Sequence, residues 1–222
     1  QYKDKTIVGF SHTHFSGTGH SDLGDILVMP TQGKVQLNPG TADRPQDGYR
    51  SPFSHDNEVA EPNYYKVKLD KHNILAELTT STRVGMHRYT FPKSDASHII
   101  FDLTSGIYNY DEKNVWTVVR VLNDSTITGY RQTNGWARTR TVYFAIKTSK
   151  PFKNYGARYY DKETPYKGFW RKFDQKNNFP DLAAHNMKLH LDFDTEDAEQ
   201  VMMKVALSPV SMRNALANME EE

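Results

Sequence analysis

The stretch Met187-Lys188-Leu189-His190-Leu191-Asp192-Phe193 alternates strictly between apolar and polar side chains. A period of two is typical of a β-strand that packs one face against a hydrophobic core. The segment 199–207 repeats this alternation. Its apolar side consists of Val201, Met203, Val205 and Leu207. Both segments therefore predict strands with one buried face.

Similar runs recur along most of the chain, separated by polar turns. We expect further strands at residues 7–10, 26–29, 64–69, 74–80, 84–91, 98–103, 116–122, 126–132 and 139–147. The connections 70–73 and 123–125 are short, polar and suited to hairpin turns. Many short strands at this spacing predict an all-β fold, an antiparallel β-sandwich.

Two other segments are expected to be loops. Residues 38–52 are polar and contain three prolines, so we expect them on the surface. Residues 154–178 are rich in Tyr, Lys and Gly, and we expect a long loop or an irregular hairpin there.

The end of the chain changes from the period of a strand to that of a helix. Ser211 is suited to an N-cap. Apolar residues follow at helical spacing, at Met212, Ala215, Leu216 and Met219. The sequence ends in three glutamates, which oppose the helix macrodipole. We therefore expect a β-sandwich domain at residues 1–209 and a helix that begins at 210–222 and is cut by the end of the chain.

The composition excludes several classes of protein. The 222 residues carry 28 Lys and Arg against 27 Asp and Glu, without the basic surplus of a broad nucleic-acid interface. The absence of Cys excludes disulfides, thiolate metal sites and thiol nucleophiles. No apolar run approaches the roughly 18–20 residues of a membrane span. We expect a soluble segment, with any export signal removed or located upstream.

The densest cluster of reactive side chains is Gly-Phe-Ser-His-Thr-His-Phe-Ser-Gly-Thr-Gly-His-Ser-Asp-Leu-Gly-Asp at residues 9–25. His12 and His14 would share one face of a strand, and with His20 and a nearby aspartate they could bind zinc or iron. Alternatively, the first two histidines support a loop whose glycines let backbone amides approach a polar ligand, with His20 and Asp22 binding that ligand. We favour the ligand loop.

A second cluster lies at residues 53–65. His55, Asp56 and Glu58 could act as acid–base groups or cation ligands. Their spacing matches no general catalytic motif. A capped turn that leads into the next strand is the simpler interpretation.

A third cluster contains Trp136 with Arg138 and Arg140. Exposed indole faces suit the C–H faces of sugars, and arginines can donate hydrogen bonds to ring hydroxyls. Trp116 and Trp170 are further candidates, and exposure decides between a sugar platform and a core residue. No Gly-x-Ser-x-Gly elbow occurs. No sequence rule identifies which two of the 27 acids would form a glycosidase pair.

Several of these motifs resemble, in order and over essentially the whole chain, the amino-terminal domain of glycoside hydrolase family 92, the calcium-dependent exo-acting α-mannosidases. The segments that carry the resemblance are residues 9–19, 22–30, 53–55, 58–60, 64–65, 82–92, 135–137, 143–144, 149–152 and 205–218.

The resemblance implies a β-sandwich of the supersandwich type, followed by linker helices and an (α/α)-barrel outside this chain. It implies an inverting exo-α-mannosidase, for example one acting on α-1,2-linkages of N-glycans, with the catalytic acid and base in the barrel. It also implies a calcium ion at the junction of the domains, with ligands outside this chain. The implied partners are α-mannoside glycans and the enzyme's own C-terminal helical domain. The implied location is the periplasm or the surface of a bacterium.

The resemblance also points to the residues that reach the terminal mannose. These are Gly19, His20 and Asp22, with Arg50 as a further candidate. His20 stands where the family commonly has Cys, which would change side-chain contacts with the sugar. Asp22 could instead cap its own turn. The chain begins after the family's Pro-Phe-Gly stretch, so the resemblance implies an N-terminally truncated β-sandwich domain at residues 1–209, with one or two strands missing, and the start of a linker helix at 210–222.

Two other functions stay open at this point. A non-catalytic carbohydrate-binding module could share the sandwich and the exposed aromatic residues. A metal-dependent β-barrel enzyme could use His12, His14 and His20.

Overall fold

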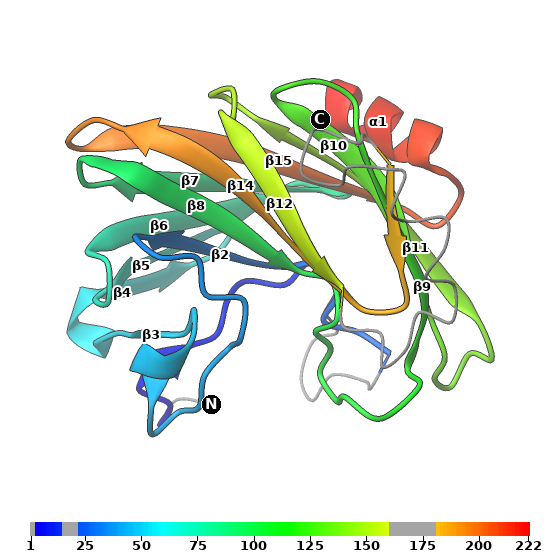
Figure 1. The fold of residues 1–222 in the computed structure, drawn as a ribbon, viewed down its shortest axis with the longest axis horizontal. Helices are drawn as coiled ribbons and strands as arrows, with labels where there is room; N and C mark the ends of the chain where they lie inside the picture. Colours follow the sequence, from blue (N-terminus) through cyan, green and yellow to red (C-terminus); the bar gives the residue numbers. More distant parts are fainter. Residues whose placement is uncertain (1–2, 15–21, 160–180) are drawn as a thin grey trace, which may run out of the picture.

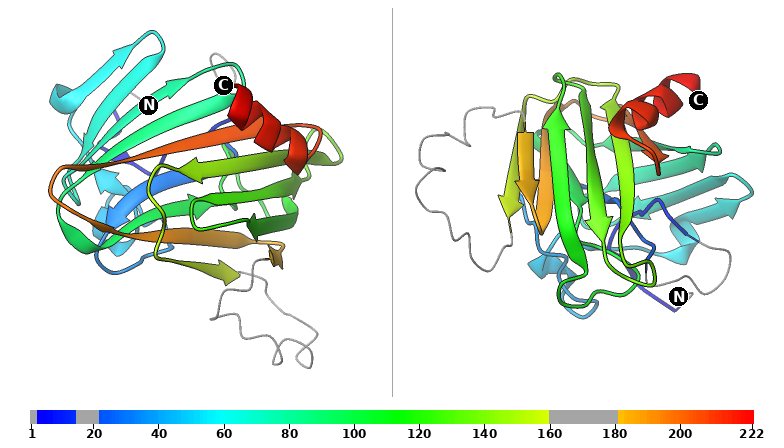
Figure 2. Two further views of the ribbon diagram at one scale, coloured as in Figure 1. Left: turned by 90° about the horizontal axis from the view of Figure 1, so that it is seen from above. Right: turned by 90° about the vertical axis from the view of Figure 1, so that its right-hand side faces the viewer.

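Two antiparallel β-sheets packed face to face make up most of the protein (Figures 1 and 2). The computed structural model describes residues 3–14, 22–159 and 181–222. Within these residues, one α-helix lies against the larger sheet. The predicted antiparallel sandwich with a short C-terminal helix is therefore confirmed.

The larger sheet has nine strands, and every neighbouring pair is antiparallel. From one edge to the other the strands are β13 (Asp181–Ala184), β9 (Asn114–Val121), β10 (Thr126–Thr133), β11 (Arg140–Thr148), β15 (Glu199–Ser208), β7 (Val84–Phe91), β6 (Ile74–Thr80), β5 (Tyr64–Leu69) and β4 (Glu58–Glu61).

The smaller sheet has four antiparallel strands. They are β12 (Asn154–Tyr159), β14 (Met187–Thr195), β8 (Ser94–Asp102) and β2 (Leu27–Gln32). A separate pair is formed by β1 (Thr6–Ile7) and β3 (Ser51–Pro52). Two short 3-10 helices, η1 (Pro45–Asp47) and η2 (His55–Asn57), lie in the connections.

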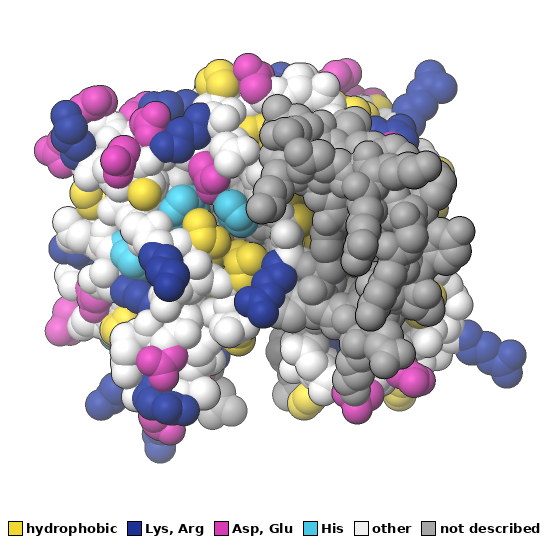
Figure 3. All heavy atoms as spheres, viewed as in Figure 1, with side chains coloured by type: hydrophobic (Ala, Val, Ile, Leu, Met, Phe, Trp, Pro, Cys, Tyr) yellow, Lys and Arg dark blue, Asp and Glu magenta, His cyan; other side chains and the backbone are white. Residues whose placement is uncertain are grey.

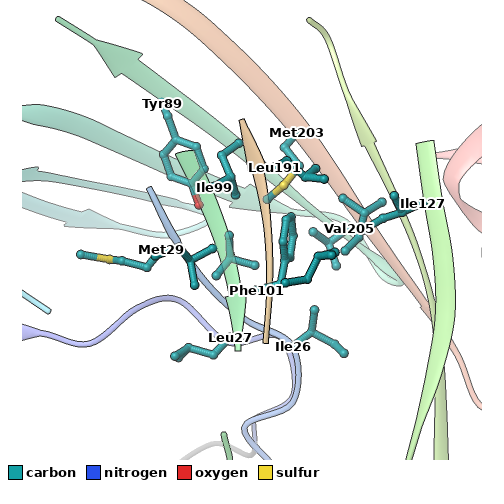
Figure 4. Packing of buried hydrophobic residues seen from close by; sticks show 14 of the residues in the cluster. Ile26, Leu27, Met29, Tyr89, Ile99, Phe101, Ile127, Leu191, Met203 and Val205 are labelled. Atoms are coloured by element: carbon teal, nitrogen blue, oxygen red, sulfur yellow. The ribbon is translucent and has the colours of Figure 1, made fainter. Parts of the chain in front are cut away.

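The core fills the space between the two sheets. The apolar positions of β14 that the sequence pattern predicts, Met187, Leu189, Leu191 and Phe193, are all buried. On β15, Val201, Met203 and Val205 are buried, and Leu207 packs against the same cluster. Figure 4 shows side chains of the smaller sheet, among them Ile99, Phe101 and Leu191, facing Met203, Val205 and Ile127 of the larger one. Each such fully buried side chain contributes roughly 1.5–3 kcal/mol.

Short-range alternation predicts the central strands well and the edge strands badly. The predicted strands at 64–69, 74–80 and 84–91 coincide with β5, β6 and β7. The hairpins predicted around 70–73 and 123–125 join β5 to β6 and β9 to β10. The pattern did not predict β4 and β13, and β12 lies in the segment expected to be a long loop or an irregular hairpin; all three are edge strands. The fourth edge strand, β2, overlaps the strand predicted at 26–29. Edge strands are often short and less covered, so their alternation is weak.

Two other expectations need correction. The strand expected at 7–10 is only β1 and an isolated bridge between Phe10 and Val28. The segment 38–52, expected on the surface, buries Tyr49, which is 1% exposed. The Tyr49 hydroxyl donates to Asp102 Oδ2 over 2.6 Å. This proline-containing segment therefore covers part of the smaller sheet's outer face, a tertiary contact that its polarity conceals.

The helix α1 (Met212–Glu221) forms as the sequence predicts. Ser211 caps it, accepting a hydrogen bond from the Asn214 amide over 3.0 Å. Its buried residues Ala215 and Met219 pack on the outer face of the larger sheet. Arg83, in the β6–β7 turn, bonds Glu221 and Glu222, which offsets the acids at the helix end. No helix in the described ranges is long and apolar enough to cross a membrane.

Candidate functional site

Two chain segments pair with each other on either side of residues 15–21. Phe10 and Val28 exchange backbone hydrogen bonds of 2.9 Å. Further along, the His12 amide donates to Asp25 O and the Gly24 amide to Thr13 O, again over 2.9 Å. These bonds fix the residues that flank the segment 15–21, which itself lies outside the described residues.

The second of these segments bends at Ile26, between its bonds to His12 and to Phe10. Ile26 has φ +51°, a conformation that β-branched residues rarely adopt. Such backbone strain typically amounts to about 1–3 kcal/mol. Two contacts hold Ile26 in place: its side chain is fully buried, and His12 Nδ1 donates to its carbonyl over 2.7 Å. Asp25, the residue before it, lies in a cluster of polar side chains.

Asp25 is the centre of that cluster and is 1% exposed. Its Oδ2 accepts hydrogen bonds from Thr13 Oγ1 over 2.6 Å and Arg140 Nη1 over 2.7 Å. Its Oδ1 accepts from Arg131 Nη1 over 3.2 Å. One buried carboxylate thus joins the base of the loop to strands β10 and β11.

Arg131 is the largest fully buried side chain of the described part of the chain. Its guanidinium also donates to Asn114 Oδ1, over 2.7 and 3.0 Å, and to the carbonyls of Thr104 and Ser105. Burial lowers the pKa of Arg131, and the negative charges of Asp25 and Asp102 oppose that change. The buried charge is acceptable because it has both a counter-ion and hydrogen-bond acceptors.

Asp22 holds a different turn, far away in the sequence. Its carboxylate accepts from the amides of Trp136, over 3.1 Å, and Ala137, over 3.2 Å. A Cβ on Gly135 would lie 1.8 Å from Asp22 Oδ1, so this approach requires glycine. The turn presents the Trp136 side chain to solvent, with the residue 85% exposed. The first and third sequence clusters therefore meet at one place.

His12 belongs to a chain of hydrogen bonds with His87 and Tyr89. The Ile26 carbonyl can only accept, so His12 carries its proton on Nδ1 and its Nε2 accepts. His87 Nε2 then donates to His12 Nε2 over 2.8 Å, and the Tyr89 hydroxyl donates to His87 Nδ1 over 2.7 Å. With all three groups neutral, each of these protons is donated to a hydrogen-bond acceptor.

The pKa values of these groups agree with a neutral chain. Burial lowers the pKa of His12 to about 4, against a smaller opposing effect of its bond to Ile26. Burial and the neighbouring His12 lower the pKa of His87 well below its usual value. Burial raises the pKa of Tyr89 well above its usual value. Because both nitrogens of His12 are engaged, this residue supports the loop base and is not poised to bind a metal.

A cleft of about 910 Å³ opens beside this loop base. Its lining joins residues 10–14 to the ends of β5, β6, β7, β11 and β15. The polar and aromatic side chains of the lining include His12, His14, Tyr64, Tyr65, Arg83, His87 and Arg140. Arg140 belongs to both features, since it lines the cleft and bonds Asp25.

The residues predicted to reach a sugar are placed as follows. Gly19 and His20 lie outside the described residues, and so does Trp170. Asp22 is 9% exposed at the base of their loop. Arg50 lies beside the β1–β3 pair, where its Nη1 donates to Thr6 Oγ1 over 3.2 Å. Sugar contacts by these residues stay predictions.

The other sequence clusters have structural roles. Ser54 caps η2 by accepting from the Asp56 amide, and Tyr65 donates to Glu58 over 2.6 Å. This is the capped turn of the simpler interpretation. His14 Nε2 contacts Ser11, both its hydroxyl and its carbonyl, instead of joining His12 in a metal site. Trp116 is half-buried against His185, whereas Trp136 is the exposed indole.

Sequence reasoning missed Arg131 and His87, although both lie on predicted strands. His87 occupies the inward face of an alternating segment, and a histidine at such a position signals a buried polar contact. Arg131 likewise occupies a buried position of β10. A charged residue on a core face is a signal that sequence alone provides, but its partners, Asp25 and Asn114, come from distant segments.

The described residues thus form an antiparallel β-sandwich with a cleft at one end. The chain belongs to glycosyl hydrolase family 92: residues 1–208 match the model of the "Glycosyl hydrolase family 92 N-terminal domain". No curated protein matched the chain.

Solved structures agree with this family. A family GH92 α-mannosidase from Bacteroides thetaiotaomicron, in complex with mannoimidazole, is 39% identical over 100% of this chain, with a TM-score of 0.87. A GH92 family glycosyl hydrolase, ccman5, is 27% identical over 96% of the chain, with a TM-score of 0.73. An inverting GH92 mannosidase from Bacteroides thetaiotaomicron VPI-5482 shares the fold at 21% identity, 100% coverage and a TM-score of 0.71. The chain spans 28%, 27% and 26% of these three chains respectively.

Proposed function

We propose that this chain forms one wall of the active site of an inverting exo-α-mannosidase. In this proposal the segment 15–21 and the adjoining cleft hold the terminal mannose, and the catalytic acid and base lie outside the chain. The observation that carries the proposal is the 39% identity, over the whole chain, with an α-mannosidase solved in complex with mannoimidazole.

The arrangement of the cleft supports a binding role. Asp25, Arg131 and Arg140 anchor the flanks of the segment 15–21 through buried charged hydrogen bonds, so the loop base is rigid. Preorganised contacts of this kind lower the entropic penalty of binding a ligand. Trp136, held out by Asp22, offers an apolar ring face beside the same loop.

The small number of acids in the described cleft supports a catalytic acid and base that lie outside this chain. An inverting glycosidase needs two carboxyl groups, one to protonate the leaving oxygen and one to activate water, about 6.5–9.5 Å apart. Among the described lining residues, Glu61 is the only carboxylic acid. Asp22 and Asp25 are occupied by amides and guanidinium groups. We therefore place the acid–base pair in the remainder of the protein.

The acidic residues near the cleft can also be compared with the needs of the calcium ion that the family resemblance implies. Calcium takes six to eight oxygen ligands, several of them carboxylates. In the described ranges no group of three acidic or histidine ligands converges on the cleft. These residues do not fit a calcium site, and we therefore place the calcium ligands outside this chain.

Hydrolysis by the full-length protein tests the proposal. We expect it to release mannose from an aryl α-mannoside, with the β-anomer detected first by NMR, and to leave the matching α-glucoside intact. Initial release of α-mannose would contradict inversion. Binding of mannosides without hydrolysis would favour a non-catalytic carbohydrate-binding module.

We also propose export to the periplasm or cell surface, because the proposed glycan substrate is met there. Fractionation of the native bacterial cells tests this point. Recovery of the protein in the cytoplasmic fraction alone would contradict it.

A further inference from the structure

A second buried polar cluster lies on the other layer of the sandwich, away from the cleft residues described above. It consists of His98 on β8 with His190 and Asp192 on β14. His98 and Asp192 are directly paired across the strands, and His190 lies two residues before Asp192 on the same face. Figure 3 shows histidine side chains gathered on the face of the molecule where these strands lie.

The three side chains meet at one oxygen atom. His98 Nδ1 and His190 Nδ1 each lie 2.7 Å from Asp192 Oδ1. The side chains are 7%, 17% and 12% exposed, in the order His98, His190 and Asp192. The cluster is therefore largely shielded from water.

The two hydrogen-bond partners of His98 are not compatible with a neutral imidazole. Its Nε2 lies 2.7 Å from the Gly33 carbonyl, which can only accept, so Nε2 carries a proton. In a neutral imidazole, Nδ1 then has a bare lone pair that faces the Asp192 carboxylate at 2.7 Å. Two electron-rich atoms at this distance need a positive centre between them. That centre is either a second proton on His98 or a metal ion.

The surroundings match the outer shell of a metal site. A ligating histidine usually donates its other ring N–H to a carbonyl or carboxylate, as His98 does to Gly33. Asp192 Oδ1 lies within 2.7 Å of both imidazole nitrogens, so the three candidate ligand atoms already converge on one point.

Two neighbours give independent support. Thr31, the direct cross-strand partner of His98, is 4% exposed, and its hydroxyl has no hydrogen-bond partner among the described residues. On the other side, a Cβ on Gly156 would lie 2.3 Å from His190 Nε2, so glycine makes room for this ring. The cluster thus has the Thr31 hydroxyl beside it, and Gly156 leaves room for the His190 imidazole.

We propose that His98, His190 and Asp192 bind a divalent transition-metal ion, with zinc as the best match. Two imidazole nitrogens and one carboxylate oxygen are typical zinc donors, whereas calcium prefers oxygen ligands alone. A tetrahedral ion with bonds of about 2.0–2.1 Å separates its ligands by about 3.3 Å, so the rings need only a small outward movement. This inference is independent of the proposed mannosidase function.

Zinc titration of the purified protein tests the site. After removal of metals by a chelator, Zn²⁺ is titrated in competition with a chromophoric chelator, and Ca²⁺ is titrated in the same way. We expect the wild type to bind one Zn²⁺ that His190→Asn and Asp192→Asn each bind at least 100-fold more weakly. His185→Asn, at an exposed histidine on the preceding turn, should bind as the wild type does.

The change in melting temperature on adding Zn²⁺ is a second measurement. It compares each variant with itself, so a lower stability of the variant does not affect it. Zn²⁺ should raise the melting temperature of the wild type and of His185→Asn, but not that of His190→Asn. Absence of zinc binding by the wild type would overturn the proposal and leave a proton as the bridge. Wild-type affinity in both cluster variants would overturn it as well.

Discussion

The loop base around Asp25 and the His–Asp cluster on β8 and β14 each place a buried aspartate near two histidines, but they balance charge differently. At the loop base, Asp25 faces two arginines, which hold their charge at any ordinary pH. The nearby His12 and His87 are hydrogen-bonded to neutral groups. In the second cluster, Asp192 faces two histidines directly.

This difference separates a site whose charges are constant from a site whose charges can change. Arginine fixes the charge of the loop base, which suits a scaffold that positions a ligand. Histidine can be neutral, protonated or bound to metal, so the second cluster depends on its surroundings. We therefore expect substitution of Asp25 to affect mainly stability, and substitutions in the second cluster to affect mainly metal binding.

Removal of the loop-base carboxylate should have the largest effect. Asp25→Asn leaves Arg131 buried without its counter-ion, and we expect the free energy of unfolding to fall by about 3–5 kcal/mol in urea titrations at pH 7. The control is Asp181→Asn, which breaks the exposed pair with Arg120 and should lower stability by less than about 1 kcal/mol. Equal effects of the two substitutions would refute the special role of Asp25.

The corresponding change in the second cluster should be milder. Asp192→Asn removes the charged acceptor of His98 and His190, but both rings can then stay neutral. In a chelator we expect a loss of about 1–3 kcal/mol. Asp194→Asn, at an exposed acid of the same strand, serves as the control and should change stability by less than about 1 kcal/mol. A loss as large as that of Asp25→Asn would remove the distinction between the two regions.

The neutral histidines of the loop base should make stability depend on pH. The pKa of His12 falls from its usual 6.5 to about 4 on folding, so the unfolded chain binds more protons between these values. Stability is then full above pH 6.5 and is lost as the pH falls toward 4. Each such histidine contributes a slope of up to about 1.4 kcal/mol per pH unit.

Urea titrations at pH 7 and pH 5 measure this slope. His87→Phe removes one of these two histidines and should make the slope shallower, while His185→Gln, at an exposed position, should leave it unchanged. An unchanged slope in His87→Phe would mean that these histidines are not neutral in the folded protein.

The smallest effect on stability is expected at the exposed indole. Trp136→Ala should change the free energy of unfolding by no more than about 0.5 kcal/mol, because the residue is 85% exposed. In the full-length enzyme it should raise KM for an aryl α-mannoside about tenfold, equivalent to about 1.4 kcal/mol. Leu122→Ala, another exposed apolar residue, is the control. Equal KM values for the two variants would place Trp136 outside the sugar site.

Much of the fold follows from local sequence. The strands β5, β6 and β7 have the predicted bounds because each central strand buries alternate side chains between hairpin turns. The cap of α1 at Ser211 is equally local. These features depend on neighbours in the sequence, so a pattern of a few residues is enough.

The sites depend on contacts that no local pattern contains. The partners of Asp22 lie 114 and 115 residues away, at Trp136 and Ala137. His190 and Asp192 occupy the polar positions of an ideal alternating strand and look solvent-exposed by sequence. They are shielded because distant segments also contact that face, with Gly33 bonding His98 and Tyr49 bonding Asp102.

The central claim is that this chain holds the sugar while catalysis depends on the remainder of the enzyme. The most direct test compares release of mannose from an aryl α-mannoside by the 222-residue chain, checked for β-structure by circular dichroism, and by the full-length protein. We predict turnover by the full-length protein and none above the buffer rate by the folded chain. Turnover by the chain alone would contradict the account.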